Sequence, residues 1–361
     1  MKKNVKGSLL KAFAIMLLLC SIGGFIYLNY KDNELYKVLE WNNYYNENNI
    51  ELFYSIDDKR LDILNDTFQV NEIVKNEEGE INKVLKIVDI VNSVVEKDDV
   101  SDIGYFNGYE ILSKKGETKK VSSKDMAIIT RDFIASLGYY ARVGEFRSNK
   151  SIFSNDTNLY VVEYYSKDKN KWIMIDYEDK GYFLKDNIPC SGIEILNNSK
   201  KELDYIGKGD KNKYYKENEN AMKTYTIMID NTMDMLKSNS NITFIKNKNG
   251  IYLMDDNKYI APTIYTKNID IFNNSPEFTS NESDSKVYAI LMKKEGDNNK
   301  FIIGGFSNGS ILDKFYIRKN DGKFEEVYKY SEIEMNSKVM KIEISKDGQT
   351  VDNEIEIRVN F

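Results

Sequence analysis

The sequence has 361 residues and a formal charge of −6, so two folded units are expected and a polyanion such as nucleic acid is a poor candidate partner. It contains no histidine. This absence excludes Cys–His and Ser–His nucleophile pairs, and it removes the commonest transition-metal ligand.

The chain begins with a basic segment that leads into an apolar run. Three lysines among the first six residues precede a stretch without charge from 12 to 28. A basic flank followed by about 20 apolar residues is typical of a signal-anchor helix whose positive end stays in the cytoplasm. We therefore expect a cytoplasmic segment at 1–7 and a single transmembrane helix at 8–29, with the bulk of the chain extracytoplasmic, at the cell membrane.

Two alternatives for this segment stay open. It is compatible with a cleaved signal peptide, although no small-x-small cleavage site precedes the polar chain. It is also compatible with lipidation at Cys20, because Leu17-Leu18-Leu19-Cys20 is similar to a lipobox. The second cysteine, Cys190, lies in a different environment, so no disulfide is predicted.

Apolar spacing predicts helices in the first half of the chain. Residues 30–80 are expected to form a juxtamembrane region of helical and mixed structure. Its partial helical stripe consists of Leu35, Val38, Leu39 and Trp41. Residues 81–95 and 123–137 repeat apolar side chains at helical spacing, and Gly138 ends the second of these helices.

Short runs of apolar, β-branched and aromatic residues predict the strands. Three follow the second helix, at 141–146, 159–165 and 171–176. The polar stretch 207–222 is expected to be a linker between one domain at 81–206 and a β-rich domain at 223–361.

The β-rich domain is predicted to be an antiparallel sandwich. Its candidate strands are 224–229, 242–245, 251–254, 287–292, 301–306, 314–317, 339–344 and 354–359. Its hairpin signals are Asn249-Gly250, Asn308-Gly309, Asp321-Gly322 and Asp347-Gly348. The expected fold class is α+β, with a helix packed on an antiparallel sheet, then an all-β sandwich-like domain, and a transmembrane helix at the N-terminus.

Two short motifs occur in the first domain: residues 137–143 read Leu-Gly-Tyr-Tyr-Ala-Arg-Val, and residues 171–176 read Lys-Trp-Ile-Met-Ile-Asp. This part of the chain resembles the transglutaminase-like (papain-like) domain of bacterial surface proteins, in which a cysteine begins a helix and Leu-Gly-x-x-Ala-Arg-Val leads into the next strand. The run 171–176 is similar to the Trp-x-x-x-Asp strand of the family. The resemblance covers about residues 81–200 and implies a papain/transglutaminase-like core.

The resemblance also implies where a catalytic triad would lie. A cysteine at a helix N-terminus is activated by the helix dipole, a histidine acts as its base, and an aspartate orients the histidine. Here the three positions hold Ser123, Leu159 and Asp176. Two of the three catalytic groups are missing, so we expect no catalytic residues and a pseudoenzyme.

The other candidate residues have simpler explanations beside the functional ones. Trp172, Arg142 and Glu163 are candidates for ligand binding in a relic groove, although packing and salt bridges explain such residues more often. Cys190 is more typical of a small packed side chain than of a nucleophile. The turn Asp255-Asp256-Asn257 lacks the spacing of a calcium loop, so no metal and no cofactor are predicted.

Three functional hypotheses remain. The first is a binding or scaffolding module at the cell envelope, whose partner is a cell-wall peptide or an envelope protein. The second is a weak acyl-transfer or peptidase-type enzyme in which Ser123 or Cys190 acts with Lys124, Asp125 or Asp176. The third is a spacer that carries the β-rich domain away from the membrane.

Overall fold

The computed structural model describes nine stretches of the chain. They are 36–41, 52–148, 158–235, 241–245, 250–255, 260–276, 288–293, 300–307 and 310–359. The predicted span 8–29 and Cys20 lie outside these residues. No helix within them has both the length and the apolar character needed to cross a membrane.

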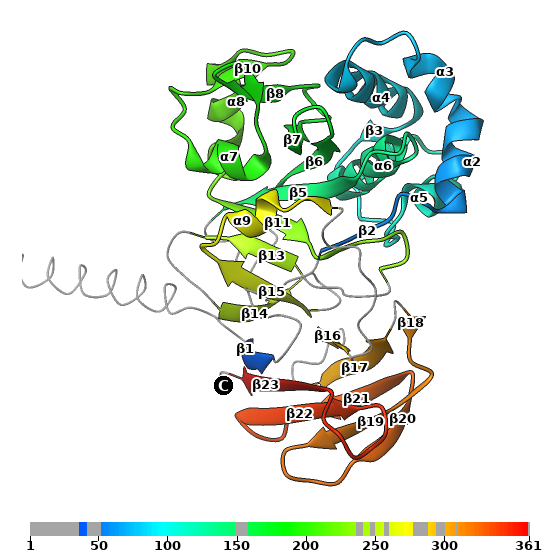
Figure 1. Ribbon diagram of the computed structural model, residues 1–361, viewed down its shortest axis with the longest axis vertical. Helices are drawn as coiled ribbons and strands as arrows, with labels where there is room; N and C mark the ends of the chain where they lie inside the picture. Colours follow the sequence, from blue (N-terminus) through cyan, green and yellow to red (C-terminus); the bar gives the residue numbers. More distant parts are fainter. Residues whose placement is uncertain are drawn as a thin grey trace, which may run out of the picture. The chain divides into compact units, whose positions relative to one another are not determined.

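Helices occupy mainly the first two thirds of the described chain (Figure 1). They are α2 (Lys59–Phe68), α3 (Val70–Val74), α4 (Glu80–Val94), α5 (Gly108–Lys114), α6 (Ser123–Ala135), α7 (Gly192–Asn197), α8 (Lys211–Asn218) and α9 (Asp270–Asn273). Helices α4 and α6 confirm the two helices predicted from apolar spacing. In α4 the buried side chains include Val84, Ile87 and Val91, which recur at the three-to-four-residue spacing of one helical face.

Twelve of the described strands form one sheet. In sheet order they are β20 (Glu325–Tyr328), β19 (Lys314–Lys319), β22 (Val339–Ser345), β23 (Asn353–Val359), β1 (Tyr36–Trp41), β14 (Gly250–Asp255), β15 (Ile260–Thr266), β13 (Asn241–Phe244), β11 (Thr224–Met228), β5 (Ala141–Arg147), β6 (Asn158–Ser166) and β7 (Lys171–Ile175). Neighbouring strands are antiparallel except β13 and β15, which are parallel.

The remaining strands form four small sheets. Their members are β2 (Phe53–Tyr54) with β12 (Asp230–Asn231), β3 (Glu96–Lys97) with β4 (Lys120–Val121), β8 (Tyr182–Lys185) with β9 (Ile188–Pro189) and β10 (Asp204–Ile206), and β16 (Tyr288–Lys293) with β17 (Lys300–Ser307), β18 (Ser310–Ile311) and β21 (Tyr330–Glu334). The described residues thus combine helices with largely antiparallel sheets, as the α+β prediction requires at this coarse level. The sandwich arrangement of residues 223–361 stays a prediction.

Three expectations about local structure differ from the structure. Residues 36–41 form a strand, β1, that pairs with β23 and β14, and not part of a helix. The predicted linker 207–222 contains helix α8, whose two tyrosines are buried. No hairpin joins the strands on either side of Asn249-Gly250, because β13 and β14 each pair with β15.

Three hairpin signals agree with the strand pairing. Asp321-Gly322 joins β19 to β20, and Asp347-Gly348 joins β22 to β23. Asn308-Gly309 lies outside the described residues, and the strands on either side of it, β17 and β18, pair antiparallel. Gly348 has a φ of 75°, a left-handed conformation that glycine adopts without steric cost.

The strands β5, β6 and β7 carry a separate apolar cluster on each face. Successive side chains of a strand point to opposite faces. Val143, Val162 and Ile173 contact the cluster that includes α6 and the other early helices. Phe146 and Met174 contact the second cluster, which extends to the later strands. The region of the predicted triad is therefore divided by a sheet.

Candidate functional site

Ser123 is the first residue of α6, directly after the residue that caps this helix. The cap is Ser122, whose hydroxyl accepts a hydrogen bond from the backbone N–H of Asp125 at 3.0 Å. Such a cap is typical of a helix start. Ser123 Oγ lies 2.9 Å from the hydroxyl of Tyr177, and it donates to Glu178 Oε1 at 3.1 Å. The predicted nucleophile position thus holds a hydroxyl that is bonded to two neighbouring side chains.

Neither partner of Ser123 has the properties of a strong base. Burial raises the pKa of Tyr177 well above its ordinary value, so its phenol keeps its proton near neutral pH. That phenol also donates to the backbone carbonyl of Ser123 at 2.7 Å. Glu178 forms an ion pair with Lys97. A serine hydroxyl needs an adjacent base to become nucleophilic, and this pair of side chains offers only a paired carboxylate.

The other two triad positions lie on the opposite face of the sheet from Ser123. Tyr177 belongs to the cluster around α6, and Leu159 belongs to the second cluster. Asp176 precedes Tyr177 and follows Ile175, both of which face α6, so strand alternation directs its side chain to the other face. The structure therefore brings Leu159 and Asp176 to one face and Ser123 to the other.

Asp176 stabilises the turn after β7. Its Oδ1 accepts hydrogen bonds from the backbone N–H groups of Glu178 at 2.9 Å and Asp179 at 3.0 Å. Its backbone forms a two-way bridge with Gly181. Burial raises the pKa of this carboxyl to about 6, against the lowering effect of the two amides. These contacts favour the structural explanation of Asp176 over a catalytic one.

The three predicted binding residues meet in one buried cluster. Arg142 Nε donates to Glu163 Oε2 at 2.6 Å, and both side chains are fully buried. The guanidinium carbon of Arg142 lies 3.9 Å from the ring centroid of Trp172. Arg142 thus combines an ion pair with a cation–π interaction in a fully buried site.

The cluster binds other segments of the same chain. Arg142 also donates to the carbonyl of Phe272 at 2.7 Å, and Trp172 Nε1 donates to the carbonyl of Asn274 at 2.9 Å. Glu163 Oε1 accepts from the backbone N–H of Gly192 at 2.7 Å. The cluster thereby joins the sheet to α7 and to the segment around α9. A ligand-binding role for its residues stays a prediction.

Cys190 is buried, and its thiol contacts the carbonyl of Ile188. Burial raises the pKa of this thiol to about 11. The thiolate is the nucleophilic form of cysteine, so the thiol is inert near neutral pH. Within the part of the chain that the structure describes, no group of three or more cysteine, aspartate and glutamate side chains is arranged to hold a metal ion.

The sequence motifs did not indicate Tyr177 and Glu178 as the partners of Ser123. Both directly follow Asp176, at the end of the Trp-x-x-x-Asp run. Successive residues of a strand point to opposite faces, so the sequence already indicates that the side chains of Asp176 and Tyr177 lie on different faces of the sheet. Which of the two faces receives α6 depends on long-range packing, which the local pattern does not contain.

Comparisons with known proteins give little further information. No family model matches the chain, and no curated protein matches it. Among solved structures, a transglutaminase from red sea bream is similar at 12% sequence identity with a TM-score of 0.27. The alignment covers 84% of this chain and 57% of that one. A similarity at this level carries no argument about fold or activity, so the resemblance to transglutaminases rests on the sequence motifs.

Proposed function

We propose that this chain is a membrane-anchored, extracytoplasmic binding or scaffolding module whose transglutaminase-like domain has lost acyl-transfer chemistry. The partner is an extended peptide of the cell envelope, either a cell-wall stem peptide or a segment of an envelope protein. The proposal rests first on one observation. Ser123, at the nucleophile position, is bonded to a buried phenol and a paired carboxylate in a chain that has no histidine.

The surroundings of Ser123 matter because acyl transfer needs an activated nucleophile. The family mechanism needs a thiolate and an imidazole side by side, and loss of such groups costs several orders of magnitude in rate. The remaining cysteine among the described residues is buried and protonated. The membrane anchor in the proposal rests on the basic and apolar N-terminal segment.

The proposal predicts binding without turnover. We expect the full-length chain in a mild detergent to bind cell-wall stem peptides saturably, as measured by calorimetry, while mass spectrometry of the recovered peptides shows no hydrolysis or acyl transfer. The Ser123→Ala variant should bind equally well, because the proposal gives its hydroxyl no role with the ligand.

A control separates the anchor from the binding function. A chain without residues 8–29 should move from the membrane fraction to the aqueous fraction and still bind the peptides. The absence of saturable binding to stem peptides and to envelope extracts would contradict the proposed function. Peptide turnover that disappears in Ser123→Ala would contradict it as well.

A further inference from the structure

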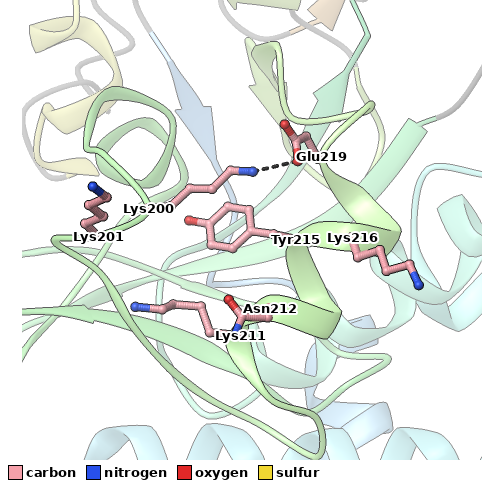
Figure 2. A pocket seen from close by; sticks show the side chains of 7 residues that line it. All are labelled: Lys200, Lys201, Lys211, Asn212, Tyr215, Lys216 and Glu219. Atoms are coloured by element: carbon pink, nitrogen blue, oxygen red, sulfur yellow. Dashed lines mark hydrogen bonds and ion pairs between the residues drawn. The ribbon is translucent and has the colours of Figure 1, made fainter.

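The pocket beside α8 does not gather its charges into a binding site. Its volume is about 590 Å³, and four of the residues that line it are lysines. Lys200 is already paired with Glu219 at 2.6 Å. Figure 2 shows the free ends of Lys201 and Lys216 pointing away from Tyr215 in opposite directions. Bonding groups that share one direction lie elsewhere, on the outer edge of β20.

Strand β20 forms one end of the twelve-stranded sheet (Figure 1). It pairs with β19, and no described strand pairs with its other edge. The backbone N–H of Lys329 donates to the carbonyl of Asp313 at 3.1 Å, which continues the register of these two strands. Hydrogen-bonded pairs alternate with non-hydrogen-bonded pairs along antiparallel strands. The backbone groups of Val327 therefore point toward β19, and those of Glu326 and Tyr328 point outward.

The other edge of β19 supports this alternation. The backbone N–H of Asn320 donates to the carbonyl of Lys341 at 2.7 Å, in the register of β19 with β22. Alternation then directs the backbone groups of Tyr316 toward β22 and away from Glu326, which lies opposite Tyr316 on β20. The N–H and C=O groups of Glu326 and Tyr328 are thus without a partner among the described residues, and a further strand could bind them.

The charges along β20 match those of a second copy of the same strand. Residues 325–329 read Glu-Glu-Val-Tyr-Lys. When two such strands run antiparallel with Val327 at the centre, Glu325 of each copy lies opposite Lys329 of the other. Both of these side chains are exposed, and neither forms an ion pair within the described part of the chain. Opposite charges at facing positions stabilise a strand pair.

The outward backbone groups fall into register in the same arrangement. Glu326 of each copy then lies opposite Tyr328 of the other, and such a pair can exchange two backbone hydrogen bonds. The side chain of Tyr328 is 67% exposed, and its hydroxyl donates to Glu326 at 2.5 Å. Burial of this ring against a second copy would add apolar contact to the hydrogen bonds.

We propose that the outer edge of β20 binds a second copy of this chain, as an antiparallel strand pair with a two-fold axis at Val327. A two-fold contact uses the same surface on both copies and therefore needs a self-complementary surface. Residues 325–329 meet this need in their charges and in their backbone groups. Charges on an edge strand usually prevent such pairing, whereas those of β20 complement one another across the axis. The contact involves few residues, so we expect a weak dimer that forms as the protein concentration rises.

The test is sedimentation equilibrium of the full-length chain in a mild detergent, combined with hydrogen exchange. We expect a monomer–dimer equilibrium and, at higher concentration, slower exchange of the amides of Glu326 and Tyr328. Glu325→Lys should weaken the dimer about tenfold, because both ion pairs become repulsive. The double variant Glu325→Lys, Lys329→Glu exchanges the two charges and should restore the wild-type affinity. The matched control is Glu117→Lys, at an exposed carboxylate outside β20, and it should leave the affinity unchanged.

Two substitutions of Tyr328 separate the backbone contribution from that of the side chain. Tyr328→Pro removes an outward N–H but no bond to β19, and Tyr328→Ala removes only the ring. We expect the proline variant to weaken the dimer more than the alanine variant, with thermal unfolding verifying that both are folded. A monomer at every concentration, equal effects of the two variants, or a charge exchange that does not restore affinity would overturn the proposal. Protection of the two amides by an envelope extract, but not by the chain itself, would assign the edge to another protein and overturn it as well.

Discussion

Replacing Glu163 with alanine is expected to lower the free energy of unfolding by about 3–5 kcal/mol, the usual cost of leaving a buried charge without its partner. Arg142 and Glu163 are fully buried and bonded at 2.6 Å. Burial alone would lower the pKa of Arg142, but the charge of Glu163 offsets this effect and keeps the guanidinium charged. The variant would also leave the backbone N–H of Gly192 without its acceptor. Urea denaturation of the full-length chain measures the change.

Two further variants show whether this loss comes from burial of the charge. Glu219→Ala removes the exposed pair with Lys200, and it should lower the free energy of unfolding far less than Glu163→Ala does. The double variant Arg142→Met, Glu163→Leu removes both buried charges, and it should be more stable than Glu163→Ala alone. Losses of the same size at Glu163 and Glu219, or a double variant that is less stable than the single one, would contradict this account.

The buried carboxyl of Asp176 is expected to make the protein less stable as the pH rises. Its pKa is raised from 3.8 to about 6 in the folded chain. Between these two values the folded state holds a proton that the unfolded state has released, so the free energy of unfolding falls as the pH increases through this window. A difference of this size corresponds to a loss of about 3 kcal/mol, complete above pH 6 or so.

The Asp176→Asn variant isolates this effect from the other titrating groups. Asparagine keeps an oxygen that can accept from the amides of Glu178 and Asp179, and it has no charge to bury. Denaturation curves of both proteins at several pH values should show that the wild type loses stability relative to the variant as the pH rises from about 4 to 6. Parallel pH profiles, or a wild type that gains stability relative to the variant, would show that the carboxyl is not desolvated.

Local periodicity predicted the elements that form the core around α6. The helix at 123–135 and the strands at 141–147 and 171–175 fall within a residue or two of the expected boundaries. These elements are rich in apolar residues, and the sequence shows such runs directly. The strand at 36–41 was missed because its partner β23 lies at the opposite end of the chain. A short apolar run of this kind is compatible with the period of a helix and with that of a strand. Pairing with the distant strand β23 makes it a strand.

The site was harder to predict than the fold. The motifs placed Ser123 at the start of a helix and Asp176 at the end of a strand, and both placements agree with the structure. The motifs do not show that these two side chains lie on opposite faces of the sheet.

Covalent labelling tests most directly whether the Ser123 hydroxyl lacks nucleophilic reactivity. The full-length chain would be treated with a fluorophosphonate probe, which modifies activated serines, and the modified peptides would be identified by mass spectrometry. Because the Ser123 hydroxyl is bonded to a protonated phenol and a paired carboxylate, we expect no modification at this position, as in Ser123→Ala. Stoichiometric modification of Ser123 that disappears in Glu178→Gln would show that the carboxylate activates the hydroxyl, and the chain would then have to be regarded as an enzyme.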